Sequence, residues 1–230
     1  MLKAEPLPLL ATGIGKKAAV AVTGTVMYGF VFGHALGNLQ VFLGPETLNA
    51  YGAMLHSMPK ALWGARIVLL GSVLVHAALA VNIYAQGKAA RPGRYKVSAP
   101  IAEQNILQRY ARQTMILSGP ILLAYIVFHL AHLTAGVVPG LYFKQGDVYG
   151  NLVRGFQNPA VAGAYMVANV LLGVHLFHGG VALFQTLGLR HPQWDARTRP
   201  VAFLVTAVVT LTNLIIPGTI VAGLIGSELR

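Results

Sequence analysis

The 230-residue chain is 55% hydrophobic and only 10% charged, whereas about a quarter of the residues in a typical soluble domain are charged. Its net charge is +11, but the basic residues lie in the termini, in the connections and near the ends of the apolar segments, which argues against nucleic-acid binding and for a topology signal. Cysteine is absent, which excludes disulfides, cysteine-ligated iron–sulphur centres and reactive thiols.

Apolar runs of about 18 residues or more predict membrane-spanning helices. After a short N-terminal arm, 1–15, which lacks the features of a cleaved signal peptide, the chain has five such runs, over about 18–43, 61–86, 110–138, 159–187 and 201–225. Each can cross a hydrocarbon core of about 30 Å at roughly 1.5 Å per residue. We therefore expect an all-α membrane protein, a single domain over residues 1–230 in which five transmembrane helices form a bundle.

The basic residues predict the orientation of this bundle. Five spans put the N-terminus, the second connection and the fourth connection on one side of the membrane, and 12 of the 17 Lys and Arg residues lie there. The positive-inside rule places that side, and the N-terminus, in the cytoplasm. The six acidic residues all lie outside the spans, which argues against a carboxylate-based ion transporter.

Four histidines lie in four different apolar segments: His34, His76, His129 and His175. Ionisable groups inside a membrane are costly and usually face the bundle interior or a functional pathway. In the predicted topology His34 and His129 lie roughly 13 Å inside the outer boundary, and His76 and His175 roughly 15–18 Å inside the cytoplasmic one. The depths predict an outer pair, His34 with His129, and an inner pair, His76 with His175. Two imidazoles in each pair can supply both axial ligands of a haem iron.

Other interpretations of these histidines remain open. A single intramembrane histidine is more often a buried, hydrogen-bonded group than a metal ligand, although four that match in depth make coincidence less plausible. Zinc fits poorly, because each pair offers two ligands without a nearby carboxylate or thiolate. His132 and His178 each lie three residues after a proposed ligand, so either could be the ligand, or could bind a haem propionate or a quinone. His56 and His191 are expected to be solvated.

Two further groups of residues are candidates for haem contacts. Gly29, Gly33 and Gly37 recur every four residues and leave a groove beside His34, which admits either a porphyrin edge or a neighbouring helix. Arg109 and Arg112 stand at the cytoplasmic start of the third segment, where they would bind haem propionates or simply anchor the helix at the membrane surface.

The motifs around the histidines resemble those of a known family. They comprise Gly33-His34-Ala35-Leu36-Gly37-Asn38, Val75-His76-Ala77, Phe128-His129-Leu130 and the stretch from His175 to Gly188. Their order and placement resemble the membrane cytochrome b subunit of succinate dehydrogenase and fumarate reductase (complex II), in its five-helix, di-haem type. Gly179 and Gly188 follow His175 by four and thirteen residues, the spacings that this family shows, so the resemblance favours His175 over His178 as the ligand.

The resemblance implies a function in a bacterial inner membrane. A partner flavoprotein subunit with FAD would oxidise succinate, and an iron–sulphur subunit on the cytoplasmic face would deliver electrons to this chain. Two haems b would pass the electrons to a quinone, typically menaquinone in di-haem members. Some fumarate-reducing members have a proton-transferring glutamate two residues before the ligand on the fourth helix, but this chain has Gly173 there.

Several points stay open at the level of sequence. The quinone site could involve Gln40 and Glu46 on the outer side, or Ser72 and Arg112 nearer the cytoplasm. Alternative functions are the di-haem anchor of a formate dehydrogenase or hydrogenase, which usually places two ligands on one helix, and a haem-free channel or transporter.

Overall fold

The computed structural model describes residues 9–90, 106–188 and 192–229, and this part of the chain is all-α. Its five long helices are α1 (Gly13–Asn38), α3 (Pro59–Ala89), α4 (Ile106–Leu130), α6 (Pro159–Thr186) and α7 (Pro192–Val221). Each contains a stretch long and apolar enough to cross a membrane. The prediction of five such helices is confirmed.

The boundaries of the long helices follow local sequence signals. Pro59 and Pro159 occupy the first turns of α3 and α6, where a missing backbone N–H costs nothing. The predicted third segment extended to 138, but the helical stretch that begins with α4 ends in a short π-helix, η4 (Ala131–Ala135). It ends there because Gly136 adopts a left-handed conformation with φ of 64°. α7 likewise ends at Val221, four residues earlier than predicted, two residues before Gly223 at φ of 73°.

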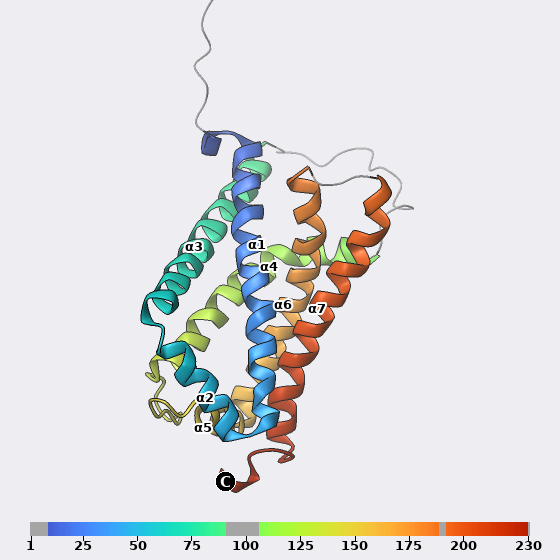
Figure 1. Cartoon of the computed structure of the whole chain (residues 1–230). Helices are drawn as coiled ribbons and strands as arrows, with labels where there is room; N and C mark the ends of the chain where they lie inside the picture. Colours follow the sequence, from blue (N-terminus) through green and yellow to red (C-terminus); the bar gives the residue numbers. More distant parts are fainter. Residues whose placement is uncertain (1–8, 91–105, 189–191, 230) are drawn as a thin grey trace, which may run out of the picture.

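The helices pack as an uneven bundle (Figure 1). The most extensive contacts join α6 to α7, α1 to α3, α4 to α6 and α1 to α6. α4 runs obliquely behind α1 and α6 and contains an internal proline, Pro120, which cannot donate to the backbone four residues earlier and so favours a kink. α1 and α4 do not form one of these pairs, and they approach each other through long side chains, since the ring centroids of His34 and His129 lie 5.8 Å apart.

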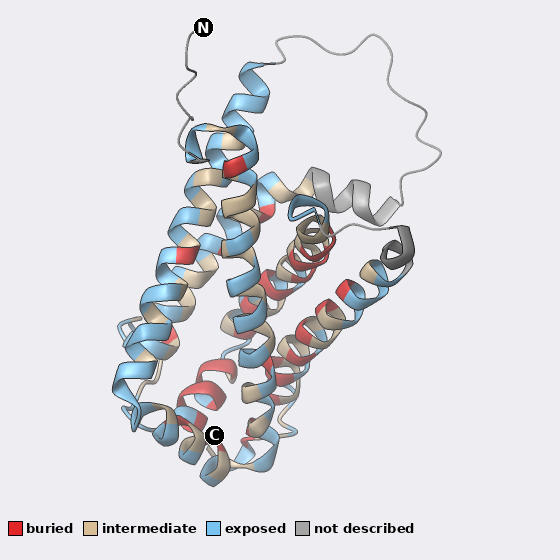
Figure 2. Cartoon of the chain, turned by 45° about the horizontal axis from the view of Figure 1, so that its top comes forward, coloured by how far each residue is buried: buried red, intermediate tan, exposed pale blue. Residues whose placement is uncertain are grey.

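Burial is distributed unequally over the bundle. Figure 2 shows buried residues concentrated in α5, α6 and α7, whereas α3 is mostly exposed along its length. Trp63, Ile67, Leu70 and Leu74 of α3 are each more than half exposed. A continuous apolar surface of this kind is unfavourable in water and favourable against lipid chains. The exposure pattern thus agrees with a multi-pass membrane protein.

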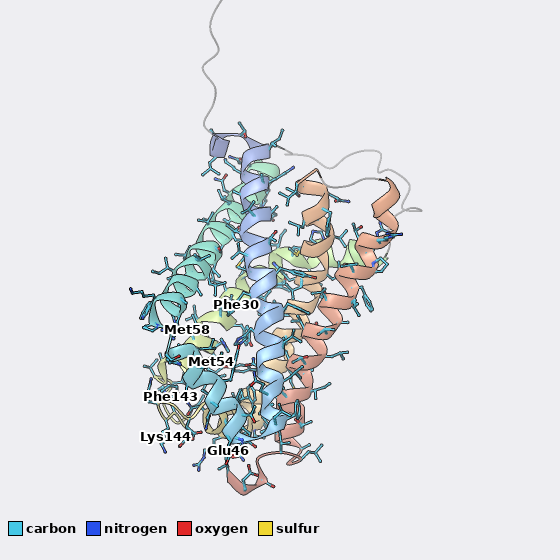
Figure 3. The ribbon with its side chains drawn as sticks, viewed as in Figure 1. Phe30, Glu46, Met54, Met58, Phe143 and Lys144 are labelled. Carbon is cyan, nitrogen blue, oxygen red and sulfur yellow. The ribbon has the colours of Figure 1, made fainter. Side chains whose placement is uncertain are left out.

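The end of the bundle opposite the start of α1 is closed by short helices. Residues 39–43 were expected to belong to the first span, and the others to connections or to the C-terminal end. We call these short helices the cap: η2 (Leu39–Leu43), α2 (Pro45–His56), α5 (Val148–Phe156) and η5 (Ser227–Leu229). Tyr149, Val153 and Phe156 of α5 are buried against the ends of α6 and α7. Figure 3 shows Glu46, Met54, Met58, Phe143 and Lys144 gathered at this end.

Hydrogen bonds hold the cap together. Asp147 caps α5 by accepting from the backbone N–H of Gly150 at 2.9 Å, and it accepts from Asn49 Nδ2 of α2 at 3.3 Å. Tyr149 donates to Glu228 Oε1 at 3.2 Å. Burial, and then the charge of Glu228, raise the pKa of Tyr149, so this hydroxyl remains a neutral donor. The cap thereby joins three segments that are distant in sequence.

We predict that Asp147→Ala lowers the free energy of unfolding by about 1–2 kcal/mol, because it removes a helix cap and leaves Asn49 without an acceptor. Thermal unfolding in detergent measures this change. Asp147→Asn retains an acceptor oxygen and serves as the matched control, with a smaller loss expected. Equal losses in the two variants would show that capping is not the cause.

The cysteine-free sequence permits a direct test of the predicted orientation. Lys144 lies in the connection beside the cap and Lys88 in the last turn of α3 at the opposite end, and both are exposed. In intact cells a membrane-impermeant maleimide should label Lys144→Cys, and should label Lys88→Cys only after the membrane is opened. The reverse pattern would place the N-terminus outside.

Candidate metal and cofactor site

The structure brings the four intramembrane histidines together as two pairs. His34 on α1 faces His129 on α4, with ring centroids 5.8 Å apart and ring planes at 84°. His76 on α3 faces His175 on α6, with centroids 6.4 Å apart and planes at 56°. These are the two pairs that depth in the membrane suggested, and we keep the names outer pair and inner pair for them.

The pairs lie at different levels of the bundle. The His76 ring contacts the backbone of Val20, in the second turn of α1. His34 lies in the last two turns of the same helix, fourteen residues after Val20. Fourteen residues rise by roughly 21 Å in an α-helix. Two separate sites therefore stack along the bundle axis.

The separations match those of two imidazoles that share one metal ion. With a metal–nitrogen bond of about 2.0 Å on each side, the ring centroids lie roughly 6 Å apart. Both ring planes then contain the bond axis, so the angle between them is free to vary. The rings also retain accessible surface, because His34 is exposed and His76, His129 and His175 are half-buried. Each pair thus has suitable donors, suitable spacing and open space beside the rings.

Hydrogen bonds orient the rings of the inner pair. His76 Nδ1 lies 3.1 Å from the carbonyl oxygen of Val20, and because a carbonyl only accepts, the proton is on Nδ1. His175 Nδ1 lies 3.2 Å from Ser118 Oγ. When Nδ1 carries the proton, Nε2 presents its lone pair, which is the form of histidine that binds a metal.

Aromatic rings surround the outer pair instead. Phe30 stacks on His34 with centroids 5.3 Å apart and ring planes at 17°, and Figure 3 shows it midway along the bundle. Tyr125 and Tyr165 lie 5.9 Å from the His129 ring. His129 Nδ1 is buried without a hydrogen-bond partner among the described residues. A buried nitrogen left without a partner is costly, but His132 Nε2 is also buried without a partner among the described residues. The position of the His129 ring opposite His34 therefore marks it as the candidate ligand.

The structure distinguishes His129 from its neighbour His132. His132 is only 1% exposed, and its Nδ1 lies 3.0 Å from the hydroxyl of Tyr165. Its other side is covered by Gly155 of α5, where an added Cβ would lie 2.7 Å from Nε2. His132 therefore fills the space between α5 and α6, while His129 is the residue whose ring lies opposite His34.

The remaining candidates are placed as follows. Gly29 and Gly33 have open space where a Cβ would lie, but a Cβ at Gly37 would lie 3.0 Å from the Tyr51 hydroxyl of α2. A Cβ at Gly24, a residue not singled out from the sequence, would lie 3.4 Å from the His76 ring. Of the three glycines, Gly37 therefore packs against a neighbouring helix, whereas Gly29 and Gly33 lie beside open space.

The structure also tests the two histidines that were expected to be solvated. His56 is exposed, as expected. It ends α2, and its Nδ1 donates to the carbonyl of Gly52 one turn earlier at 2.8 Å, a bond that could not be foreseen while residues 45–56 were expected to form a connection. His191 lies outside the described residues.

Polar candidates for propionate or quinone binding are spread over the bundle. Arg109 and Arg112 belong to the first turns of α4, but their side chains lie outside the described residues. Ser72 is buried on α3, one turn before His76, whereas Gln40 and Glu46 belong to the cap. The quinone site therefore stays open.

The number and type of ligands in each pair distinguish between the metals that could bind there. Among the described residues no group of three or more His, Cys, Asp or Glu side chains could hold a metal ion. Zinc prefers four protein ligands, or three and a water, whereas the iron of haem already has four porphyrin nitrogens and needs two axial ligands. Two neutral imidazoles in an apolar setting suit haem.

No protein family, curated protein or solved structure that we compared matches the chain. The resemblance to the cytochrome b subunit of complex II therefore rests on the motifs quoted above and stays a prediction.

We predict that His178→Ala and His132→Ala each retain the wild-type haem content, because the opposing rings belong to His175 and His129. His175→Ala should lose one of two haems. Quantitation of extracted haem against protein, on variants that remain monodisperse in detergent, measures this. If His178→Ala lost a haem and His175→Ala did not, the ligand on α6 would be His178.

Proposed function

We propose that this chain is the di-haem membrane anchor of a succinate:quinone oxidoreductase in a bacterial inner membrane. The observation that carries the proposal is the pair of opposed histidine couples, at 5.8 and 6.4 Å, inside a bundle of five helices able to cross a membrane. Bound haem would supply one-electron redox chemistry, and its two positions would connect the cytoplasmic side to a membrane quinone.

The chain's own residues would bind and orient the two groups. His76 and His175 hold the inner position, and their Nδ1 hydrogen bonds fix the direction of each ring. His34 and His129 hold the outer position, where stacking on Phe30 restricts rotation of the His34 ring. The apolar face of α3 keeps the assembly in lipid. The cap closes the outer end and separates the outer position from water.

The partners follow from charge and from the resemblance. In the proposed orientation the cytoplasmic face carries Lys16, Lys88, Arg197 and Arg199 among its described residues, and positive surfaces favour acidic partners. We infer that the iron–sulphur subunit docks there and that the flavoprotein subunit with FAD binds through it. The quinone, menaquinone in our proposal, would accept the electrons, so succinate oxidation itself belongs to the partner subunits.

Two alternatives have less support. In the anchors of formate dehydrogenases and hydrogenases two ligands usually share one helix, whereas here each of four helices contributes one opposed histidine. Operation as a fumarate reductase with a proton-transferring glutamate is disfavoured at Gly173, which packs directly against Thr210 of α7. A glutamate side chain at that position would have to displace α7.

The reduced-minus-oxidised absorbance spectrum of the purified chain tests the cofactor. We expect two b-type haems per chain, and His76→Ala and His34→Ala should each remove a different one, because each breaks one pair. Absence of b-type absorbance in a folded wild-type chain would refute the proposal. Loss of both haems, or of neither, in folded single variants would refute the pairing.

Electron donors distinguish the proposed enzyme from its alternatives. The tagged chain, purified from its native membranes in mild detergent, should carry FAD and iron–sulphur signals, and succinate should reduce its haems. Reduction by formate or hydrogen instead of succinate would identify it as a different respiratory anchor.

A further inference from the structure

We propose that Ser118 is a positioning residue for the inner pair: it accepts the Nδ1 proton of His175 and thereby fixes the ring and raises its strength as a ligand. This inference rests on the proposed function, because it concerns how the chain holds a haem iron. Ser118 lies on α4, whereas His175 lies on α6, 57 residues later.

The direction of the hydrogen bonds follows from their partners. Ser118 Oγ lies 3.3 Å from the carbonyl oxygen of Met115 and 3.2 Å from His175 Nδ1. A carbonyl oxygen only accepts, so we assign the single hydroxyl proton of Ser118 to Met115. With this assignment the hydroxyl oxygen accepts from His175 Nδ1. The Nε2 lone pair of His175 is then left for a ligand bond.

The hydrogen bond between Ser118 and His175 is buried, so its loss should affect the orientation of the His175 ring. Ser118 is only 1% exposed, so water does not readily replace it as the acceptor for His175. His76, the opposing ligand, uses the backbone carbonyl of Val20 for the same purpose. Thr23 Oγ1 also lies 3.4 Å from His76 Nδ1, but the Val20 carbonyl is closer to that nitrogen. Ser118 is thus the side chain through which the orientation of His175 can be altered without changing a ligand.

The position of Ser118 also gives α4 a role in both sites. His129, which faces His34 in the outer pair, lies eleven residues further along the same helix. Eleven residues correspond to roughly 16 Å of helix rise. One helix therefore supplies a ligand to the outer site and the acceptor that orients a ligand of the inner site.

The hydrogen bond from His175 to Ser118 should change the reduction potential of the inner haem in a defined direction. An imidazole that donates from Nδ1 is a more basic ligand, and a more basic axial ligand stabilises the oxidised iron. Removing the acceptor weakens this stabilisation and leaves the ring free to rotate. The reduction potential of the inner haem should therefore rise when Ser118 loses its hydroxyl, while the outer haem should keep its potential.

The test is a redox titration of the purified complex, followed by absorbance and by the low-spin ferric signals in electron paramagnetic resonance. The inner haem is identified as the one missing from His76→Ala. In Ser118→Ala we expect a higher potential and a shifted ferric signal for that haem alone, or its selective loss. Ser118→Thr keeps the hydroxyl and should restore the wild-type values. Thr219→Ala is the control, because it removes a hydroxyl bonded to carbonyls of its own helix.

The outcomes separate this inference from the proposed function. A wild-type complex with two haems and a Ser118→Ala variant with unchanged potentials and signals would overturn the role of Ser118 and leave the proposed function standing. Equal shifts of both haems in Ser118→Ala would likewise overturn it. A folded wild-type complex without haem would refute the proposed function itself.

Discussion

The cost of an imidazole in an apolar bundle is the constraint on which this structure depends. A polar group inside a membrane needs a partner, and the four histidines on α1, α3, α4 and α6 are placed so that each lies opposite another. The two rings of each pair lie farther apart than a direct hydrogen bond requires. Their centroid separations, 5.8 and 6.4 Å, suit two imidazoles that share a metal ion. The proposed haem sites would therefore satisfy a requirement that the fold itself creates.

The rest of the bundle holds these rings at their separation. α7 contributes no histidine and packs closely on α6, where Thr210 lies against Gly173 and Asn213 donates to Asn169 Oδ1 at 2.8 Å. Hydrogen bonds of this kind contribute about 1 kcal/mol or less between membrane helices, but they fix the register of α6, which carries His175. The cap acts at the other end, where α5 covers His132 through Gly155.

The sequence predicted the parts of the fold that depend on simple periodic signals. Five apolar runs gave five helices because length and hydropathy determine which segments can cross a bilayer, and the facing of His34 with His129 followed from their equal depth. Helices α2 and α5 were missed, since each is short and interrupted by glycine. α5 is buried by packing on α6 and α7, and α2 packs on α5 and η2. Gly136 and Gly223, which end the third and fifth spans, were not recognised as left-handed stops.

Tertiary contacts account for what could not be predicted about the site. Depth favoured His129 but left His132 as an alternative, and the packing that separates the two comes from Gly155 and Tyr165, which lie on other helices. The bond from His175 to Ser118 joins residues far apart in sequence. The position of Ser118 inside the third span was an available signal, because a polar side chain inside a span usually has a specific partner.

The most direct test of the central claim is an experimental structure of the chain in its native complex, with the iron positions located by anomalous scattering. We predict two iron sites, one between His34 and His129 and one between His76 and His175, each within a flat density of porphyrin size. Histidine pairs that contact each other directly, or that enclose only water, would contradict the account.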